Sequence, residues 1–106
     1  MTLSLRAVIA ELREKLNELY GKRLAHVVLF GSQARGDAVE GSDIDILVVL
    51  QGLVSPGKEI SRIGELTSSL SLRNDIVISC TFVSAERYEN EKSPLLLNVH
   101  REGVLV

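Results

Sequence analysis

Two polar segments, Gly31-Ser-Gln-Ala-Arg-Gly36 and, after a short loop, Ser42-Asp-Ile-Asp45, are the best starting point for interpreting this sequence. Before them lies a short, mostly apolar run, 24–30, which stops at Gly31, and after them lies a second run, 44–50. Runs of this length that are rich in Val, Ile and Leu are typical of largely buried strands. The two segments are therefore predicted to connect two strands and to place polar side chains at the ends of both.

Asp43 and Asp45 stand two positions apart where the second predicted strand begins. Alternate side chains of a strand point to one face, so the two carboxylates should project together while Ile44 and Ile46 point into the core. Two anions held this close repel each other, and a hard divalent cation such as Mg²⁺ relieves that repulsion. A loop end with two solvated aspartates is the alternative, and the spacing alone favours it.

Asp75 is predicted to open a third strand, at the edge of the apolar run 76–83. If the second and third strands are neighbours, this carboxylate can join the first two. Three carboxylates suit a site for two metal ions, which clamp the attacking and leaving oxygens of a displacement. Taken alone, an aspartate before a strand is more often a turn or cap residue.

Gly31 and Ser32 follow the first predicted strand directly. A glycine lets the chain turn sharply and lets a ligand approach the backbone, and the N–H groups after it can start a short helix that binds phosphate. Arg35 lies one helical turn after Ser32 and can reach the same anion with its planar set of donors. Most isolated Gly-Ser pairs are plain turns.

An amphipathic helix is predicted at the start of the chain, where apolar residues recur at helical spacing (Leu5, Val8, Ile9, Leu12, Leu16 and Leu19). Ser4 is expected to cap its start, and Gly21 is expected to lie just past its end. Glu11 and Lys15 stand four apart and are expected to pair on the exposed side.

Another helix is predicted between the second and third strands, because Ile60, Ile63, Leu66 and Leu70 keep helical spacing. Pro56 suits its first turn and Ser55 its cap. A strand, helix and strand of this length indicate a crossover unit with parallel strands.

The last part of the chain is predicted to hold two short helices. Ser84 is expected to cap the first, which runs to Tyr88. Pro94 opens the second, which ends at Gly103. Residues 104–106 are expected to form a final edge strand.

Composition restricts the class of protein. The chain has 106 residues and a net charge of −2, which predict one domain over residues 1–106 and argue against strong binding to nucleic acid. It lacks both a signal peptide and a membrane-spanning apolar run, so a cytoplasmic location is expected. Cys80 is expected to be buried, and His26 and His100 are expected to be structural.

Together these segments resemble the minimal nucleotidyltransferases, a group within the DNA polymerase β-like superfamily. The shared pattern is a Gly-Ser pair after a strand, an Asp-x-Asp and a third acidic residue on a later strand, with a basic residue after the Gly-Ser. The matching residues are Gly31, Ser32, Arg35, Asp43, Asp45 and Asp75. The resemblance extends along nearly the whole chain, including the ending Arg101-Glu-Gly-Val. It implies an α/β (α+β) nucleotidyltransferase core, with a small mixed or parallel sheet of three to four strands flanked by helices.

The resemblance also implies a reaction and its metal ions. A nucleoside triphosphate such as ATP would bind over the Gly-Ser turn, and an acceptor hydroxyl would attack its α-phosphorus. Asp43 and Asp45 would hold two Mg²⁺ ions, and Asp75 would hold the one nearest the acceptor. Ser32 and Arg35 would steady the triphosphate.

The acceptor that the resemblance implies is a protein. Minimal nucleotidyltransferases often act as antitoxins that attach AMP to a helical toxin of the HEPN type. Two alternatives stay open: a non-catalytic module that neutralises a helical partner, and an enzyme that modifies a small molecule such as an aminoglycoside. A homo-oligomer is also open, because the first and last helices can offer apolar surface.

Overall fold

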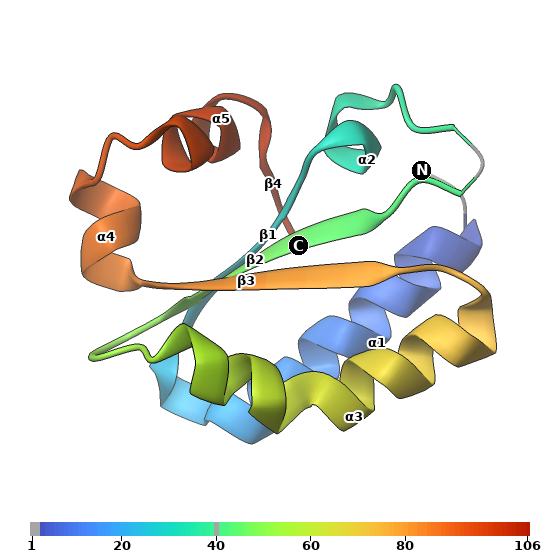
Figure 1. Cartoon of the computed structure of the whole chain (residues 1–106), viewed down its shortest axis with the longest axis horizontal. Coiled ribbons are helices and arrows are strands. Elements are labelled where there is room, and N and C mark those ends of the chain that lie inside the picture. The colour runs from blue at the N-terminus through green and yellow to red at the C-terminus, as the bar shows by residue number, and fades with distance from the viewer. Residues whose placement is uncertain (1–2, 40) are drawn as a thin grey trace.

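A computed structural model describes residues 3–39 and 41–106 of the chain (Figure 1). Its elements, in chain order, are α1 (Leu3–Tyr20), a 3-10 turn η1 (Gly21–Arg23), β1 (Leu24–Phe30), α2 (Ser32–Arg35), β2 (Ile44–Leu50), α3 (Pro56–Asn74), β3 (Ile78–Ser84), α4 (Ala85–Asn90), α5 (Pro94–Glu102) and β4 (Val104–Leu105).

The four strands form one mixed sheet in the order β3-β2-β1-β4. β1 runs antiparallel to both β2 and β4, whereas β2 and β3 are parallel and are joined through α3. A parallel pair needs a long crossover connection, and α3 provides it. The predicted crossover unit, the mixed sheet and the final edge strand are thereby confirmed.

Helices cover both faces of the sheet, with α1 and α3 on one face and α4 and α5 on the other (Figure 1). β2 lies inside the sheet and alternates between the two cores. Ile44 and Ile46 belong to the larger cluster with α1 and α3, and Leu47 and Val49 belong to the smaller cluster with Leu96 of α5. Burial on both faces explains why β2 is an almost continuous apolar run.

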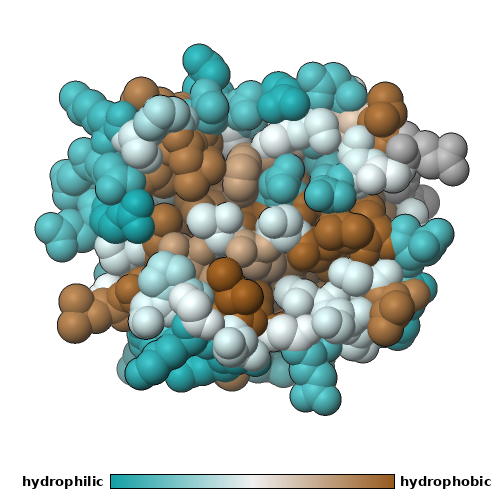
Figure 2. Space-filling model, viewed as in Figure 1, coloured by the Kyte–Doolittle hydropathy of each residue, from teal (hydrophilic) through white to brown (hydrophobic). Residues whose placement is uncertain are grey.

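β3 is one of the two edge strands of the sheet, and it crosses the face shown in Figure 2, where hydrophilic residues gather mostly at the rim. Pale and brown residues, which are neither strongly polar nor charged, run across the centre of this face. Among residues 3–39 and 41–106, no strand pairs with the outer edge of β3.

The first helix differs from its prediction in detail. It begins at Leu3, so Ser4 lies inside it and does not cap it. Glu11 pairs with Arg73 of α3, and Lys15 pairs with Glu18 at 3.7 Å, so the predicted Glu11–Lys15 pair is wrong. The ion pair across two helices replaces the local one because α1 and α3 pack side by side.

The later helices follow the predictions closely. Ser84 caps α4 by accepting a hydrogen bond from the backbone N–H of Arg87 at 3.2 Å, although this helix continues beyond Tyr88. Ser55 lies at the cap position of α3 but makes no capping hydrogen bond through its side chain. α5 begins at Pro94, as predicted.

Across the described part of the chain, no helix combines the length and apolar character that crossing a membrane requires.

Cys80 is partly buried, and burial raises the pKa of its thiol to about 12. Because the thiolate is the reactive form, this thiol is a poor nucleophile at neutral pH.

A buried polar contact joins α1 to α3. The Tyr20 hydroxyl donates to Glu59 Oε1 at 2.8 Å, and the two side chains are only 6% and 5% exposed. Arg62 lies 3.6 Å from the same oxygen and stacks over the Tyr20 ring. Burial, followed by the hydrogen bond to Glu59, raises the pKa of Tyr20, so the hydroxyl keeps its proton and remains a donor.

Tyr20→Phe is expected to destabilise the fold by about 1–3 kcal/mol, because it leaves a buried Glu59 oxygen without its hydroxyl donor. The free energy of unfolding, from urea titration at pH 7, measures the effect. Tyr88→Phe is a matched control that removes a hydroxyl at a half-buried position, and it should change stability by less than about 0.5 kcal/mol. Equal stabilities of the two variants would contradict the role given to the Tyr20–Glu59 contact.

Candidate active site

Gly31 forms the turn between β1 and α2. Its φ of 74° and ψ of −157° lie in a region that only glycine adopts readily. Its carbonyl accepts the backbone N–H groups of Ala34 and Arg35, both at 3.1 Å, so the short helix that was predicted after Ser32 begins here. A Cβ on Gly31 would overlap Asp45 Oδ2. The bare α-carbon is therefore what allows the carboxylate of Asp45 to lie against this turn.

Hydrogen bonds hold the end of the loop between α2 and β2 that leads into β2. Ser42 Oγ accepts the backbone N–H of Val39 at 2.9 Å, and the Ser42 carbonyl accepts Gln33 Nε2 at 3.4 Å. The first residue of β2, Ile44, donates its backbone N–H to Val77 O at 2.9 Å. These contacts fix the backbone on both sides of Asp43.

Asp43 and Asp45 lie close enough for the charge of one to act on the other, although Asp43 precedes β2, which begins at Ile44. Ile44 and Ile46 are fully buried on the opposite face, Asp45 is half-buried and Asp43 is exposed. Asp45 lies opposite Phe30 in the register of β1 and β2, next to Gly31. Burial raises the pKa of Asp45, the negative charge of Asp43 raises it further, and Arg35 opposes both effects. The two carboxylates and the guanidinium thus act on one another within one site.

Arg35 is held by two carboxylates. Its Nε lies 3.1 Å from Asp37 Oδ2, and its Nη1 lies 3.1 Å from Glu102 Oε1 at the end of α5. Neither partner was predicted from the sequence. For Asp37, a signal was available in its spacing of two residues from Arg35. For Glu102, the only signal was its place in the ending Arg101-Glu-Gly-Val.

Asp75 does not open the third strand, so that prediction is wrong. β3 begins at Ile78, and Asp75 ends α3 in the left-handed conformation with a φ of 50°. The residue of β3 that lies beside Asp45 in the parallel register is Ser79. Asp75 is exposed and lines a shallow hollow with Gly41 and Val77. It therefore lies at the same end of the sheet as the aspartate pair, before the strand that was expected to carry it.

The structure does not gather the three predicted metal ligands. Within residues 3–39 and 41–106, no group of three His, Cys, Asp or Glu side chains is arranged to hold a metal ion. The carboxylate pair itself fits a divalent cation, because burial and the charge of Asp43 both raise the pKa of Asp45, and a bound cation would favour the ionised form against both effects. A third ligand from Asp75 stays a prediction.

The two histidines lie away from this site and pack on Tyr88. The ring centroids of His26 and His100 are 5.3 and 4.5 Å from that of Tyr88, and His100 Nε2 lies 2.6 Å from the Tyr88 carbonyl oxygen. Both histidines thus have packing partners, as the structural interpretation expected.

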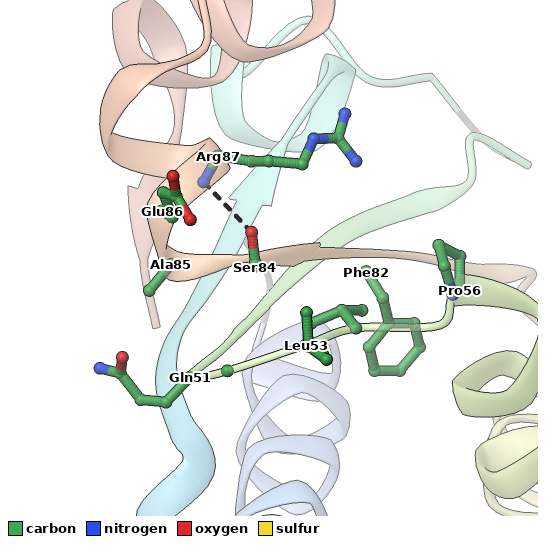
Figure 3. Close-up of a pocket in the computed structure, with 10 residues that line it drawn as sticks. Gln51, Leu53, Pro56, Phe82, Ser84, Ala85, Glu86 and Arg87 are labelled. Atoms are coloured by element: carbon green, nitrogen blue, oxygen red, sulfur yellow. Dashed lines mark hydrogen bonds between the residues drawn. The ribbon is translucent and has the colours of Figure 1, made fainter.

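A second hollow, of about 470 Å³, lies at the opposite ends of β2 and β3 (Figure 3). Leu53, Pro56 and Phe82 contribute its apolar lining, and the dashed line marks the hydrogen bond that caps α4 at Ser84. Glu86 is the one carboxylate among its lining residues, so this hollow offers no paired acidic ligands.

Comparisons with known proteins agree with this fold. The family model described as the nucleotidyltransferase domain matches residues 9–104. The chain belongs to the nucleotidyltransferase domain family. Its relatives include the protein adenylyltransferase MntA of Thermococcus cleftensis, which is 35% identical over 78 residues, covering 74% of this chain and 77% of the relative.

Two further similarities are informative. A Methanocaldococcus jannaschii protein, MJ0141, named as a candidate protein adenylyltransferase, is 38% identical over 72 residues, covering 68% of this chain and 72% of its own. A crystal structure described as a toxin-antitoxin with AMP-PNP superposes with a TM-score of 0.61 at 25% identity, over 88% of this chain and 68% of that one. The chain thus belongs to the nucleotidyltransferase enzymes and has their fold, and the two relatives named here carry the name protein adenylyltransferase.

Proposed function

We propose that this protein transfers AMP from ATP to a hydroxyl group of a partner protein in a Mg²⁺-dependent reaction, and that it acts as the antitoxin of a HEPN-type helical toxin. The observation that carries the proposal is the pair Asp43 and Asp45 beside the Gly31 turn. There a half-buried carboxylate with a raised pKa, a second carboxylate and an arginine meet next to a glycine turn whose bare α-carbon leaves room for the Asp45 carboxylate.

The reaction is a displacement at phosphorus. The acceptor oxygen forms a bond to the α-phosphorus, the bond from that phosphorus to the bridging oxygen breaks, and pyrophosphate leaves with the electron pair. The acceptor proton passes to a carboxylate of the site or to water. Catalysis of this kind depends on positioning and on neutralising charge.

Each residue has a role that follows from its position. Asp43 and Asp45 would hold Mg²⁺, which when bound neutralises the triphosphate and favours the ionised acceptor. The turn at Gly31 and Ser32 would receive phosphate oxygens on backbone N–H groups and the Ser32 hydroxyl. Arg35 would steady the negative charge that develops on the phosphates.

The similarities support the protein acceptor. The Thermococcus relative is named a protein adenylyltransferase, and the superposed crystal structure is described as a toxin-antitoxin with an ATP analogue. These are properties of those proteins, and their extension to this chain is the proposal.

One labelling experiment tests it. The purified protein is incubated with Mg²⁺ and with ATP labelled on the α-phosphate, together with the product of the neighbouring gene. Labelling of the partner would support the proposal if it does not occur in a parallel reaction that contains EDTA from the start. A parallel reaction with aminoglycosides and no partner detects the small-molecule alternative. Absence of label from every acceptor, with ATP not bound either, would contradict the proposal.

The position of Asp75 favours a second candidate, a binding module without catalysis. A site that lacks a third carboxylate in place has fewer groups to bind metal and activate an acceptor. This candidate predicts a stable complex that suppresses the partner's toxicity with no label transferred, and with unchanged suppression by an Asp43→Ala variant.

A further inference from the structure

Arg35 is clamped between partners from distant parts of the chain. Asp37 lies two residues away in the loop and its side chain is 62% exposed. Glu102 lies 67 residues away and its side chain is 19% exposed. Ion pairs that are shielded from water are weakened less by salt than exposed ones. The Glu102 contact is therefore the better shielded of the two.

The two carboxylates leave part of the guanidinium available. Asp37 accepts from Nε and Glu102 accepts from Nη1, each at 3.1 Å. Nη2 has no hydrogen-bond acceptor in the part of the chain that the structure describes. A guanidinium has five N–H donors in one plane, so holding two of its nitrogens fixes the direction of the third. Within the described residues, both N–H groups of Nη2 and the second N–H of Nη1 are therefore left to bind phosphate oxygens.

Glu102 is itself positioned by the strand that leads to the site. It ends α5, and Gly103 follows with no room for a side chain, because a Cβ there would overlap Val99 O and lie 2.7 Å from Val28 Cγ1. Then β4 pairs with β1 through Val28↔Leu105 and Leu29↔Val104. The same strand, β1, continues into Gly31. Glu102 and the turn at Gly31 are therefore both anchored to β1, Glu102 through the strand that follows it and Gly31 directly.

We propose that Glu102 is a positioning residue, which reaches from the C-terminal helix to hold Arg35 in the orientation that binds the triphosphate. Figure 1 shows α2 and α5 on the same side of the sheet, where this contact is made. The proposal rests on the proposed function, because it deepens the role of the same site. It connects the ending of the chain to nucleotide affinity, without any contact between Glu102 and the nucleotide.

An opposite effect is conceivable on the same geometry, since Glu102 could compete with phosphate for Arg35. The two effects differ in sign. If Glu102 orients Arg35, then its loss weakens ATP binding, because a free arginine side chain must be ordered when the nucleotide binds. If Glu102 competes, then its loss strengthens ATP binding.

The test is a double-mutant cycle with Glu102→Gln, Arg35→Gln and the double variant, read out as KM and kcat for ATP and as Kd for a non-hydrolysable ATP analogue with Mg²⁺. We expect Glu102→Gln to raise KM and Kd about five-fold, with kcat changed less than about two-fold. In the Arg35→Gln background the same substitution should have no further effect, because Glu102 acts through Arg35.

Two additional variants keep the result interpretable. Glu91→Gln removes the carboxylate of a comparable ion pair, to Arg87 at 2.8 Å, away from the site, and it should leave KM unchanged. Glu102→Asp keeps the charge on a shorter side chain and should recover part of the lost affinity. An unchanged or lowered KM in a folded Glu102→Gln variant, or additive effects in the double variant, would overturn the role of Glu102. Failure of the proposed function would show differently, as a wild-type protein that neither binds ATP with Mg²⁺ nor transfers AMP.

Discussion

Asp45→Asn is expected to lower the rate of Mg²⁺-dependent AMP transfer by about a thousand-fold or more, because it removes one of two paired metal ligands. The asparagine has nearly the same shape and is accommodated next to Gly31, so the fold should persist. Circular dichroism and the transfer of α-labelled phosphate from ATP measure the two properties on one sample.

Stability provides an independent readout of the same substitution. Because the pKa of Asp45 is raised in the folded protein, the folded state binds its proton more tightly than the unfolded state does. The ionised carboxylate therefore lowers stability, fully at pH values above the raised pKa and not at all below the ordinary value for aspartate. In the absence of metal at pH 7, Asp45→Asn should be at least as stable as the wild type, and its advantage should disappear as the pH falls through this window.

Addition of Mg²⁺ with an ATP analogue should reverse that order. Ligands that bind only the folded state raise its melting temperature, so the wild type should gain stability and the variant should not. Glu14→Gln, an exposed substitution on α1, is the control and should behave as the wild type in both assays. Full transfer by Asp45→Asn would remove Asp45 from the metal ligands.

Gly31→Ala is the second substitution with a large expected effect, because an added Cβ would overlap Asp45 Oδ2 and the φ of 74° with ψ of −157° disfavours any side chain. We expect a loss of about 1–3 kcal/mol of stability from the backbone. Moving the Asp45 carboxylate away from the turn should also reduce transfer by about a hundred-fold, since misplacement by about 1 Å can have that effect. Urea titration and the labelled transfer assay measure both.

Gly52→Ala separates strain from the effect on the site. Gly52 also has a positive φ, of 80°, but a Cβ there would meet no atom within 4 Å, and it lies in the loop after β2, away from Asp45. This variant should lose about 1 kcal/mol of stability and retain transfer. If Gly31→Ala keeps the wild-type rate, then the carboxylate of Asp45 does not need the space above this turn.

Most of the secondary structure was predictable from the sequence because its signals are local. The apolar runs 24–30 and 44–50 became β1 and β2 with the predicted bounds, and Pro56 and Pro94 opened helices. Ser4 was predicted to cap the first helix but lies inside it, because local propensity defines the ends of helices poorly. The third strand begins two residues later than predicted because α3 extends to Asn74 and needs a turn before the sheet resumes.

The candidate site was predictable in part, for the same reason. The alternation of a strand predicted that Asp43 and Asp45 project together, and in the structure the charge of Asp43 acts on Asp45. The need for a sharp turn indicated Gly31, whose φ is 74°. The position of Asp75 was not predictable, since it depends on where α3 ends and on the left-handed conformation that ends it. Asp75 follows the last residue of α3 and lies three residues before the first residue of β3, so a small error in either boundary changes the element to which it is assigned.

By itself, the sequence determined the order of helices and strands, the parallel crossover and the sharp turn at Gly31, because each follows from the pattern within a short segment. Only the tertiary structure decided which distant groups meet. Tyr20 and Glu59 are separated by 39 residues, and Arg35 and Glu102 by 67. The packing of whole elements selects such partners, as when β4 pairs with β1 and brings Glu102 to Arg35. A local sequence pattern carries no information about contacts between residues so far apart in the chain.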